Sequence, residues 1–154
     1  MSPPVLHTPR CMITIMARDD AEWLNTLLND EAVNTYIEGI RPFAKSVMNT
    51  SEFIDGMLDI NNNGKGFLWK VMQREKPVGF ICTIDFDDNP SLCYALEKPY
   101  RKKGLMSEAL KAVLIHQSLI MDKKYYVEIN SKNLDSYNLC KKLIRAFDII
   151  IQSY

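Results

Sequence analysis

The spacing of apolar residues along the chain predicts alternating strands and helices. Short apolar or alternating runs predict strands at residues 11–16, 66–72, 77–85, 91–97, 125–130 and 146–152. Apolar residues at helical spacing predict helices after Asp19 and Asp20, and at residues 30–37, 50–61, 104–120 and 133–145. This order contains no repeat and no linker, so we expect one α/β domain with a mixed sheet over residues 1–154. The proline-spotted residues 1–9 are expected to be loose.

Charge and hydropathy narrow the possible partners. The 154 residues carry 19 basic and 19 acidic side chains, so no net field would attract nucleic acid or an anionic membrane. The longest apolar stretch, residues 112–121, is interrupted by polar residues and is shorter than the roughly 18 to 20 residues of a membrane span. The first ten residues lack the apolar core of a signal peptide. We therefore expect a cytoplasmic protein.

The cysteines and histidines do not predict a metal site. No two cysteines form a CxxC pair, and neither histidine is close to a cysteine that would complete a zinc-binding motif. The residues concerned are Cys11, Cys82, Cys93, Cys140, His7 and His116. Nothing indicates a disulfide framework, so we expect reduced thiols.

A basic turn before the helix at 104–120 is the most informative segment. Arg101, Lys102 and Lys103 precede Gly104, which opens the helix. The first turn of a helix has unpartnered N–H groups and the positive end of the dipole, and glycine allows a close approach to the backbone. These features predict a pyrophosphate cradle. A solvated basic turn is the alternative from local sequence alone.

The same turn resembles a known family motif. The stretch RKKGLMSEAL resembles the acyl-CoA-binding motif Q/R-x-x-G-x-G/A of the GNAT superfamily, most closely its RimJ/RimL-like branch. Arg101, Gly104 and Met106 occupy the motif positions, and Lys102 stands where the family often has glycine. Residues 125–143 resemble the family's following strand and helix, with its N-x-x-S/A element at Asn133 and Ser136. The resemblance implies a GNAT-like α/β fold: a mixed, mostly antiparallel sheet flanked by helices.

The resemblance also implies a mode of binding acetyl-CoA, the family's acyl donor. The strand end Ala95-Leu96-Glu97 would bond the pantetheine arm through its backbone. Asn133 would bond the arm near the thiol, although a plain helix cap is an equally good local interpretation. The N–H groups that would hold the pyrophosphate belong to Lys102, Lys103, Gly104, Leu105 and Met106.

Chemistry in this family is direct transfer from the thioester to an amine. Asn133, Ser136, Tyr137 and Cys140 fall on one helical face. Many relatives have a tyrosine at the position of Cys140, so the donor to the leaving thiolate would be Ser136, Tyr137 or water. Tyr137 as a core aromatic is the alternative. Cys140 as a covalent nucleophile is disfavoured, because no cationic or histidine partner is evident.

The general base is less well defined. Glu38, in a loop, and Asp85, at a strand end, are weak candidates to face the acceptor, and a surface carboxylate is the favoured interpretation of each. Backbone carbonyls and water can also accept the proton.

The C-terminal segment departs from the family pattern. The family usually has Leu-Gly-Phe and then a two-strand hairpin, whereas this chain has Leu143-Ile144-Arg145-Ala146-Phe147. We expect a shortened C-terminal end that alters the acceptor groove. The run at 147–151, FDIII, would leave an exposed edge, relieved by a homodimer through residues 146–152, by pairing within its own sheet, or by disorder. We favour the homodimer.

The sequence therefore predicts an N-acetyltransferase that moves an acetyl group from acetyl-CoA to a primary amine, on a protein N-terminus or a small molecule. A catalytically impaired acyl-CoA-binding protein and an interaction domain with the same fold are the alternatives.

Overall fold

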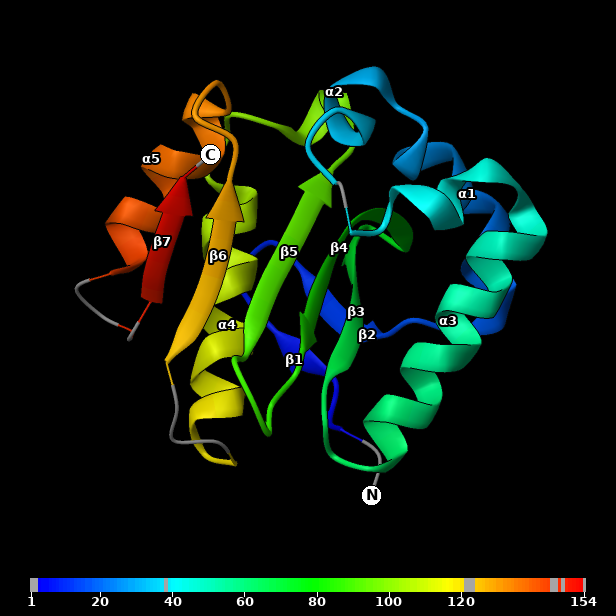
Figure 1. The fold of residues 1–154 in the computed structure, drawn as a ribbon, viewed down its shortest axis with the longest axis horizontal. Coiled ribbons are helices and arrows are strands. Elements are labelled where there is room, and N and C mark those ends of the chain that lie inside the picture. Colours follow the sequence, from blue (N-terminus) through cyan, green and yellow to red (C-terminus); the bar gives the residue numbers. More distant parts are fainter. Residues whose placement is uncertain (1–2, 38, 121–123, 145–146, 148, 154) are drawn as a thin grey trace.

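One seven-stranded sheet, with its strands in sequence order, organises the molecule (Figure 1). The computed structural model describes residues 3–37, 39–120, 124–144, 147 and 149–153. The first five strands are antiparallel, and the last two join in parallel, which confirms the predicted mixed, mostly antiparallel sheet. The strands are β1 (Leu6–His7), β2 (Met12–Ile15), β3 (Phe67–Gln73), β4 (Lys76–Ile84), β5 (Ser91–Leu96), β6 (Tyr125–Ile129) and β7 (Ile149–Ser153).

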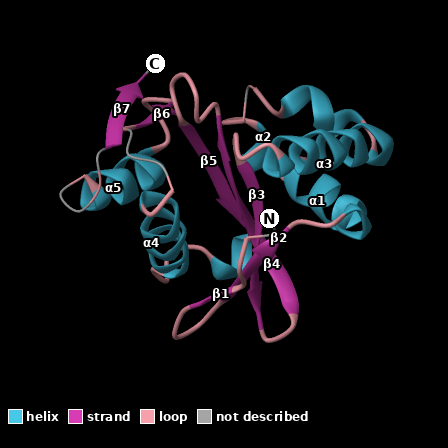
Figure 2. Ribbon diagram, turned by 90° about the horizontal axis from the view of Figure 1, so that it is seen from below, coloured by secondary structure: helices cyan, strands magenta, loops and turns pink. Residues whose placement is uncertain are grey.

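Helices cover both faces of this sheet (Figure 2). One face carries α1 (Ala21–Leu28), α2 (Glu31–Asn34) and α3 (Val47–Asn62). The other carries α4 (Leu105–Ser118) and α5 (Leu134–Leu143). Short 3-10 turns add η1 (Arg18–Asp20), η2 (Arg41–Lys45) and η3 (Lys98–Tyr100). Within the described ranges, no helix combines the length and apolar character needed to cross a bilayer.

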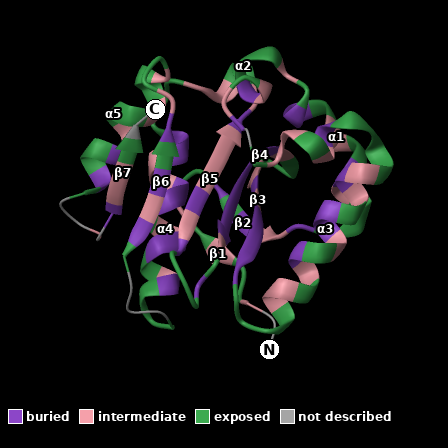
Figure 3. Ribbon diagram, in the orientation of Figure 1, coloured by how far each residue is buried: buried purple, intermediate pink, exposed green. Residues whose placement is uncertain are grey.

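Two apolar cores result, one on each face. The strands β3 and β4 are sandwiched between them and are buried along most of their length, as Figure 3 shows. Trp69 packs towards α4 and Phe80 towards α3, and both are fully buried. Because both faces of β3 and β4 are covered by apolar cores, successive side chains on either face are apolar, and the two strands have nearly continuous apolar sequences.

A buried polar network fixes α4 on the sheet. Gln117 is completely buried, and its Oε1 accepts hydrogen bonds from Trp69 Nε1 at 3.2 Å and Thr83 Oγ1 at 2.8 Å. Its amide nitrogen donates to the hydroxyl of Tyr125. A fully satisfied buried network allows few alternative orientations, so the opposite end of α4, at Gly104, is held in a defined position.

The strands β5 and β6 separate soon after they meet. Their parallel ladder contains the single pair Ser91↔Tyr126, whereas β4 and β5 pair along six positions from Ile84↔Ser91 to Gly79↔Leu96. Beyond Ser91, one backbone edge of β5 is therefore left facing a gap.

The N-terminal segment is more ordered than its composition suggested. Residues 1–9 were expected to be loose, but Leu6 and His7 form β1 and pair with Ile13 and Met12. The reason is packing, because Leu6 lies against the main core, and Thr8 closes the turn through hydrogen bonds with Cys11.

The C-terminal strand pairs within its own sheet. The strand β7 runs parallel to β6, from Tyr125↔Ile149 to Ile129↔Ser153, rather than forming a hairpin, because α5 carries the chain back across the sheet. Ile149 is buried, and Ile150 and Ile151 are half-buried. The three isoleucines are thus largely covered, which removes the main reason for expecting a homodimer through residues 146–152. Residues 146 and 148 of that segment lie outside the described residues.

Candidate functional site

A groove of about 1480 Å³ begins at the gap between β5 and β6. It has two arms. The turn arm is lined by the end of β5, residues 101–107 and the start of α5. The wall arm is lined by residues 32–60 and by the sheet face opposite them. A pocket for one small ligand typically measures about 300–1,000 Å³, so the groove has room for two substrates.

Most of the predicted site residues line this groove. Glu97, Lys103, Tyr137 and Cys140 are the predicted residues that do not contribute to its lining. The predicted residues that do are Ala95, Leu96, Arg101, Lys102, Gly104, Leu105, Met106, Asn133 and Ser136.

Of the three predicted residues at the end of β5, Ala95, Leu96 and Glu97, only Leu96 directs its backbone N–H and C=O groups towards the gap. The N–H of Glu97 donates to Val78 O on β4 at 2.8 Å. Because backbone groups alternate along an antiparallel ladder, Ala95 also points its groups towards β4, whereas Tyr94 and Leu96 point theirs towards the gap. The carbonyl of Leu96 accepts Arg101 Nε at 2.9 Å, as this alternation requires. The open edge therefore consists of Tyr94 and Leu96, and an extended ligand could pair with it there.

The turn into α4 is shaped to receive an anion. Lys102 and Gly104 both adopt left-handed backbone conformations, with φ of 63° and 76°. The N–H groups from Lys102 to Met106 have no backbone acceptor in the part of the chain that the structure describes. They lie at the positive end of the helix dipole. The positive φ of Lys102 also explains why relatives often have glycine at this position.

Arg101 is engaged away from this cradle. Its Nη2 lies 3.2 Å from Asp30 Oδ1, in addition to the bond from Nε to Leu96. The same Asp30 oxygen caps α2 by accepting the N–H groups of Ala32 and Val33 at 3.0 and 3.3 Å. Burial raises the pKa of Asp30, but the bond and charge of Arg101 together with the N–H groups of Val33 and Ala32 bring the pKa below its usual value. Arg101 therefore links the turn arm to the first helix of the wall arm.

A second arginine, which the sequence analysis missed, supports the turn from behind. Arg10 Nη1 donates to Lys103 O at 2.8 Å, and Arg10 Nε donates to Glu108 Oε1 at 2.9 Å. Burial raises the pKa of Glu108, but hydrogen bonds from Thr8 and Arg10 bring it below its usual value. The turn between β1 and β2 thus fixes the first turn of α4. No local pattern in the sequence signals a contact between segments so far apart.

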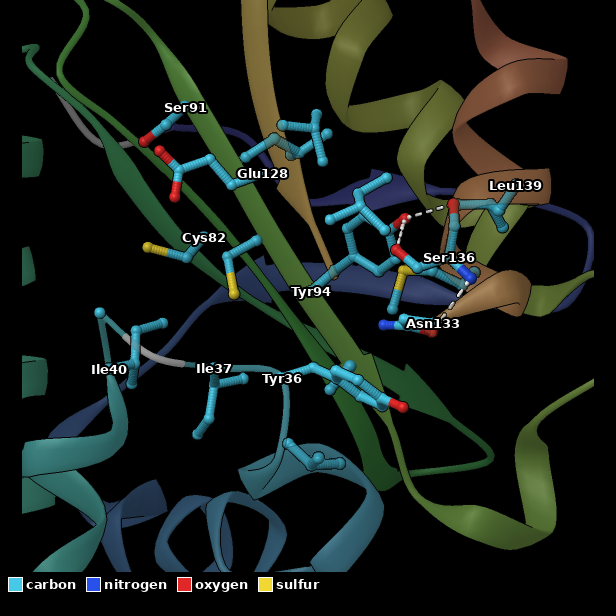
Figure 4. Close-up of a pocket in the computed structure, with 18 of the residues that line it drawn as sticks. Tyr36, Ile37, Ile40, Cys82, Ser91, Tyr94, Glu128, Asn133, Ser136 and Leu139 are labelled. Carbon is cyan, nitrogen blue, oxygen red and sulfur yellow. Dashed lines mark hydrogen bonds between the residues drawn. The ribbon is translucent and has the colours of Figure 1, made fainter. Parts of the chain in front are cut away.

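A phenol from β5 reaches the helix α5. The hydroxyl of Tyr94 lies 2.7 Å from Ser136 Oγ and 3.1 Å from Cys140 Sγ, and both are hydrogen-bonded to it (Figure 4). Burial, reinforced by Cys140, raises the pKa of Tyr94 well above its usual value, so the phenol stays protonated. The sequence predicted this hydroxyl on α5 itself. The structure supplies one from the neighbouring strand, next to Cys140.

Tyr137 and Cys140 have different environments from those considered. Tyr137 is 40% exposed, so the interpretation of it as a core aromatic is wrong. Its neighbour on the helix, Cys140, is fully buried, and burial raises the pKa of its thiol. A buried thiol of raised pKa is a poor nucleophile, which supports the view that Cys140 does not form a covalent intermediate.

Asn133 caps the helix α5 and also lines the groove. Its Oδ1 caps α5 by accepting the N–H of Ser136 at 3.3 Å, and the residue lines the turn arm.

Glu128 faces the groove from the other side of the sheet. Along β6, Tyr125, Val127 and Ile129 pack into the core under α4, so Glu128 points to the opposite face, where Figure 4 shows it near Ser91. It is exposed and lines the groove. Asp85 also lines the groove and is exposed, whereas Glu38 lies outside the described residues. Alternation in the run YYVEI was the available signal for Glu128.

Comparison with known proteins identifies the family to which this fold belongs. A model of the acetyltransferase (GNAT) domain matches residues 10–143. The chain belongs to the GNAT family. The matched region ends at the last residue of α5, so the parallel strand β7 lies outside the range that the family model matches. A search of curated proteins found no significant match.

Solved GNAT structures have the same fold at low sequence identity. RimL, a ribosomal L7/L12 alpha-N-protein acetyltransferase in complex with coenzyme A, has a TM-score of 0.79 at 14% identity, over 90% of this chain and 82% of its own. The ribosomal-protein-S5-alanine acetyltransferase of Vibrio fischeri has a TM-score of 0.75 at 12% identity, over 92% of this chain and 82% of its own. The microcin C7 self-immunity acetyltransferase MccE, in complex with acetyl-CoA and AMP, has a TM-score of 0.70 at 17% identity, over 88% of this chain and 78% of its own. At these identities the likeness establishes the fold.

Proposed function

We propose that the chain is a single-domain N-acetyltransferase that moves an acetyl group from acetyl-CoA to a primary amine. The observation that carries the proposal is the gap between β5 and β6. It has an anion cradle at one end, Tyr94 on one face of the sheet and Glu128 on the other. A thioester donor and an amine could meet there from opposite faces.

The residues of the turn arm fit the parts of acetyl-CoA in order. The N–H groups of residues 102–106 suit the pyrophosphate, and the atom nearest to where a Cβ of Gly104 would lie is the cationic Arg10 Nη2, at 3.5 Å. The open edge of Tyr94 and Leu96 suits the amides of the pantetheine arm. Asn133 lies at the start of α5, near the Tyr94 and Ser136 hydroxyls, which suits the thiol end. The neighbours RimL and MccE carry coenzyme A or acetyl-CoA, which supports the same donor here.

The two faces of the gap would divide the chemistry. The amine nitrogen forms a bond to the acetyl carbon, and the carbon–sulfur bond breaks. Glu128, directly or through water, accepts the proton that the amine must lose. Tyr94 donates a hydrogen bond to the departing thiolate. The pKa of Tyr94 is raised and therefore lies above that of a free thiol, which is about 8.5. We infer that the phenol stabilises the thiolate by a hydrogen bond without giving up its proton.

The acceptor is a primary amine on a protein N-terminus or on a small molecule. RimL and the Vibrio fischeri enzyme are named for ribosomal-protein acceptors, which favours a protein N-terminus as one class to test.

Calorimetry with acetyl-CoA, followed by thiol release in the presence of amines, tests the proposal. We expect acetyl-CoA to bind, and free thiol to appear only when an amine is present. Binding without thiol release for any amine would identify a catalytically impaired acyl-CoA-binding protein. Absence of binding would identify an interaction domain that retains the fold.

A further inference from the structure

The wall arm presents an apolar surface that is only partly covered. Tyr36, Ile40 and Phe43 are half-buried and line the groove, and Phe43 stacks on Phe53 with ring centroids 5.0 Å apart. Figure 4 shows Tyr36, Ile37 and Ile40 along one side of the groove. The sheet on the other side contributes apolar side chains of its own, from Cys82, Ile84, Cys93 and Ala95.

The basic residues of the groove belong to the turn arm, which also carries the carboxylate of Asp135. Within the described residues, the lysines and arginines that line it are Arg101, Lys102, Lys132 and Lys142, and all of them lie between η3 and the end of α5. The charged residues that the wall arm and the adjacent sheet contribute within the described ranges are all carboxylates. They are Glu52, Asp85, Asp88 and Glu128, and all four are exposed. A cationic ammonium group is therefore favoured on this side, and an anionic acceptor is disfavoured.

We propose that the acceptor is a primary amine that carries an apolar substituent, with the amine beside Glu128 and the substituent against Tyr36, Ile40 and Phe43. This inference rests on the proposed acetyl transfer and names its substrate class. The half-buried side chains would lose their remaining contact with water on binding such a group, whereas a purely polar amine would leave them exposed. The substituent can be part of a free arylalkylamine or the first side chain of a peptide.

A matched panel of acceptors tests this substrate class. We expect kcat/KM for phenethylamine to exceed that for ethylamine by about tenfold or more, because one apolar group in a pocket typically changes specificity by about 10–200-fold. Spermidine, which adds charge for the carboxylates but no apolar group, should be a poorer acceptor than phenethylamine. Equal rates for ethylamine and phenethylamine, or a preference for spermidine, would overturn the proposal.

Variants locate the effect on the wall. Ile40→Ala should lower the ratio of phenethylamine to ethylamine about threefold or more, because it removes part of the apolar surface. Met48→Ala is the matched control, since Met48 is 72% exposed at the start of α3 and does not line the groove. An unchanged ratio in Ile40→Ala would overturn the assignment of the wall.

Peptides distinguish the two sources of the apolar group. A tetrapeptide that begins with Phe should exceed the same peptide beginning with Ser if the acceptor is a peptide N-terminus. Turnover of phenethylamine alone would identify a free amine.

If the wild type releases no thiol with any amine, the acetyl-transfer proposal fails, and binding decides this inference separately. Calorimetry should still show phenethylamine binding to the protein saturated with coenzyme A, with about threefold or more loss of affinity in Ile40→Ala. No binding of phenethylamine would overturn the inference as well.

Discussion

The two arms of the groove are built in different ways. The turn arm consists mainly of consecutive backbone groups from one segment, where β5 leads through η3 into α4. The wall arm consists of side chains from α2, η2, α3, the segment between α2 and η2, and four strands, namely β4, β5, β6 and β7. A site made of contiguous backbone is visible as a sequence motif, whereas a site made of side chains from distant segments depends on how the whole chain folds. In the proposed function, the first arm binds the donor and the second binds the acceptor.

The largest expected effect concerns the turn arm. Gly104→Asp should abolish acetyl-CoA binding, because it places a carboxylate beside N–H groups that would otherwise receive phosphate oxygens. Gly64→Asp is the matched control, since Gly64 also has a left-handed backbone (φ 70°) and open surroundings but lies outside the groove. Calorimetry should show wild-type affinity for Gly64→Asp. Retained affinity in a folded Gly104→Asp protein would show that the phosphates bind elsewhere.

The next effect concerns the proposed base on the acceptor side of the sheet. Glu128→Gln should lower kcat about a hundredfold or more, because general bases typically contribute 10²–10⁴-fold, while acetyl-CoA affinity should not change. Asp85→Asn is the comparison, because Asp85 also lines the groove. The backbone of residue 85 is left-handed (φ 64°), a conformation that both Asp and Asn tolerate, so the change should not disturb the fold. Steady-state kinetics would contradict the assignment if Asp85→Asn lost more activity than Glu128→Gln.

A smaller effect is expected from the hydroxyl on the donor side. Tyr94→Phe should lower kcat about tenfold and leave acetyl-CoA affinity nearly unchanged, because Ser136 or water can partly replace a hydrogen bond to the thiolate. The exposed Tyr137 provides the control, since Tyr137→Phe should have wild-type rates. Since the pKa of Tyr94 is raised, its ionisation should not limit the rate at neutral pH. Full activity in Tyr94→Phe would leave solvent as the donor.

The smallest effect tests the connection between the arms. Asp30→Asn removes the charge that pairs with Arg101, while the Asn side chain can still cap α2, so the link between the two arms should loosen. We expect KM for the amine to rise about threefold, because an ion pair of this exposure contributes about 0.2–1 kcal/mol, with little change in kcat or acetyl-CoA affinity. If Asp30→Asn instead binds acetyl-CoA more tightly, the released Arg101 contacts the phosphates, as the family motif first suggested.

The sequence predicted what depends on local pattern. The order of strands and helices followed from hydrophobic periodicity, and the cradle at residues 101–106 followed from one contiguous motif. Contacts between distant segments could not be predicted in this way. The bonds from Tyr94 to Ser136, from Arg101 to Asp30 and from Arg10 to Glu108 each join residues that only the folded sheet brings together. The direction of β7 was also not predictable, because it depends on the path of the chain after α5.

Single-turnover analysis of the wild type tests direct transfer in the gap between β5 and β6 most directly. The protein is mixed with acetyl-CoA, first alone and then with phenethylamine and with a peptide that begins with Phe, and protein and products are followed by mass spectrometry. We predict an unmodified protein in the absence of an amine, and equal amounts of N-acetylated amine and free coenzyme A in its presence. An acetyl group that accumulates on the protein at Cys140 before the amine is added, or coenzyme A released without an acetylated amine, would contradict the account.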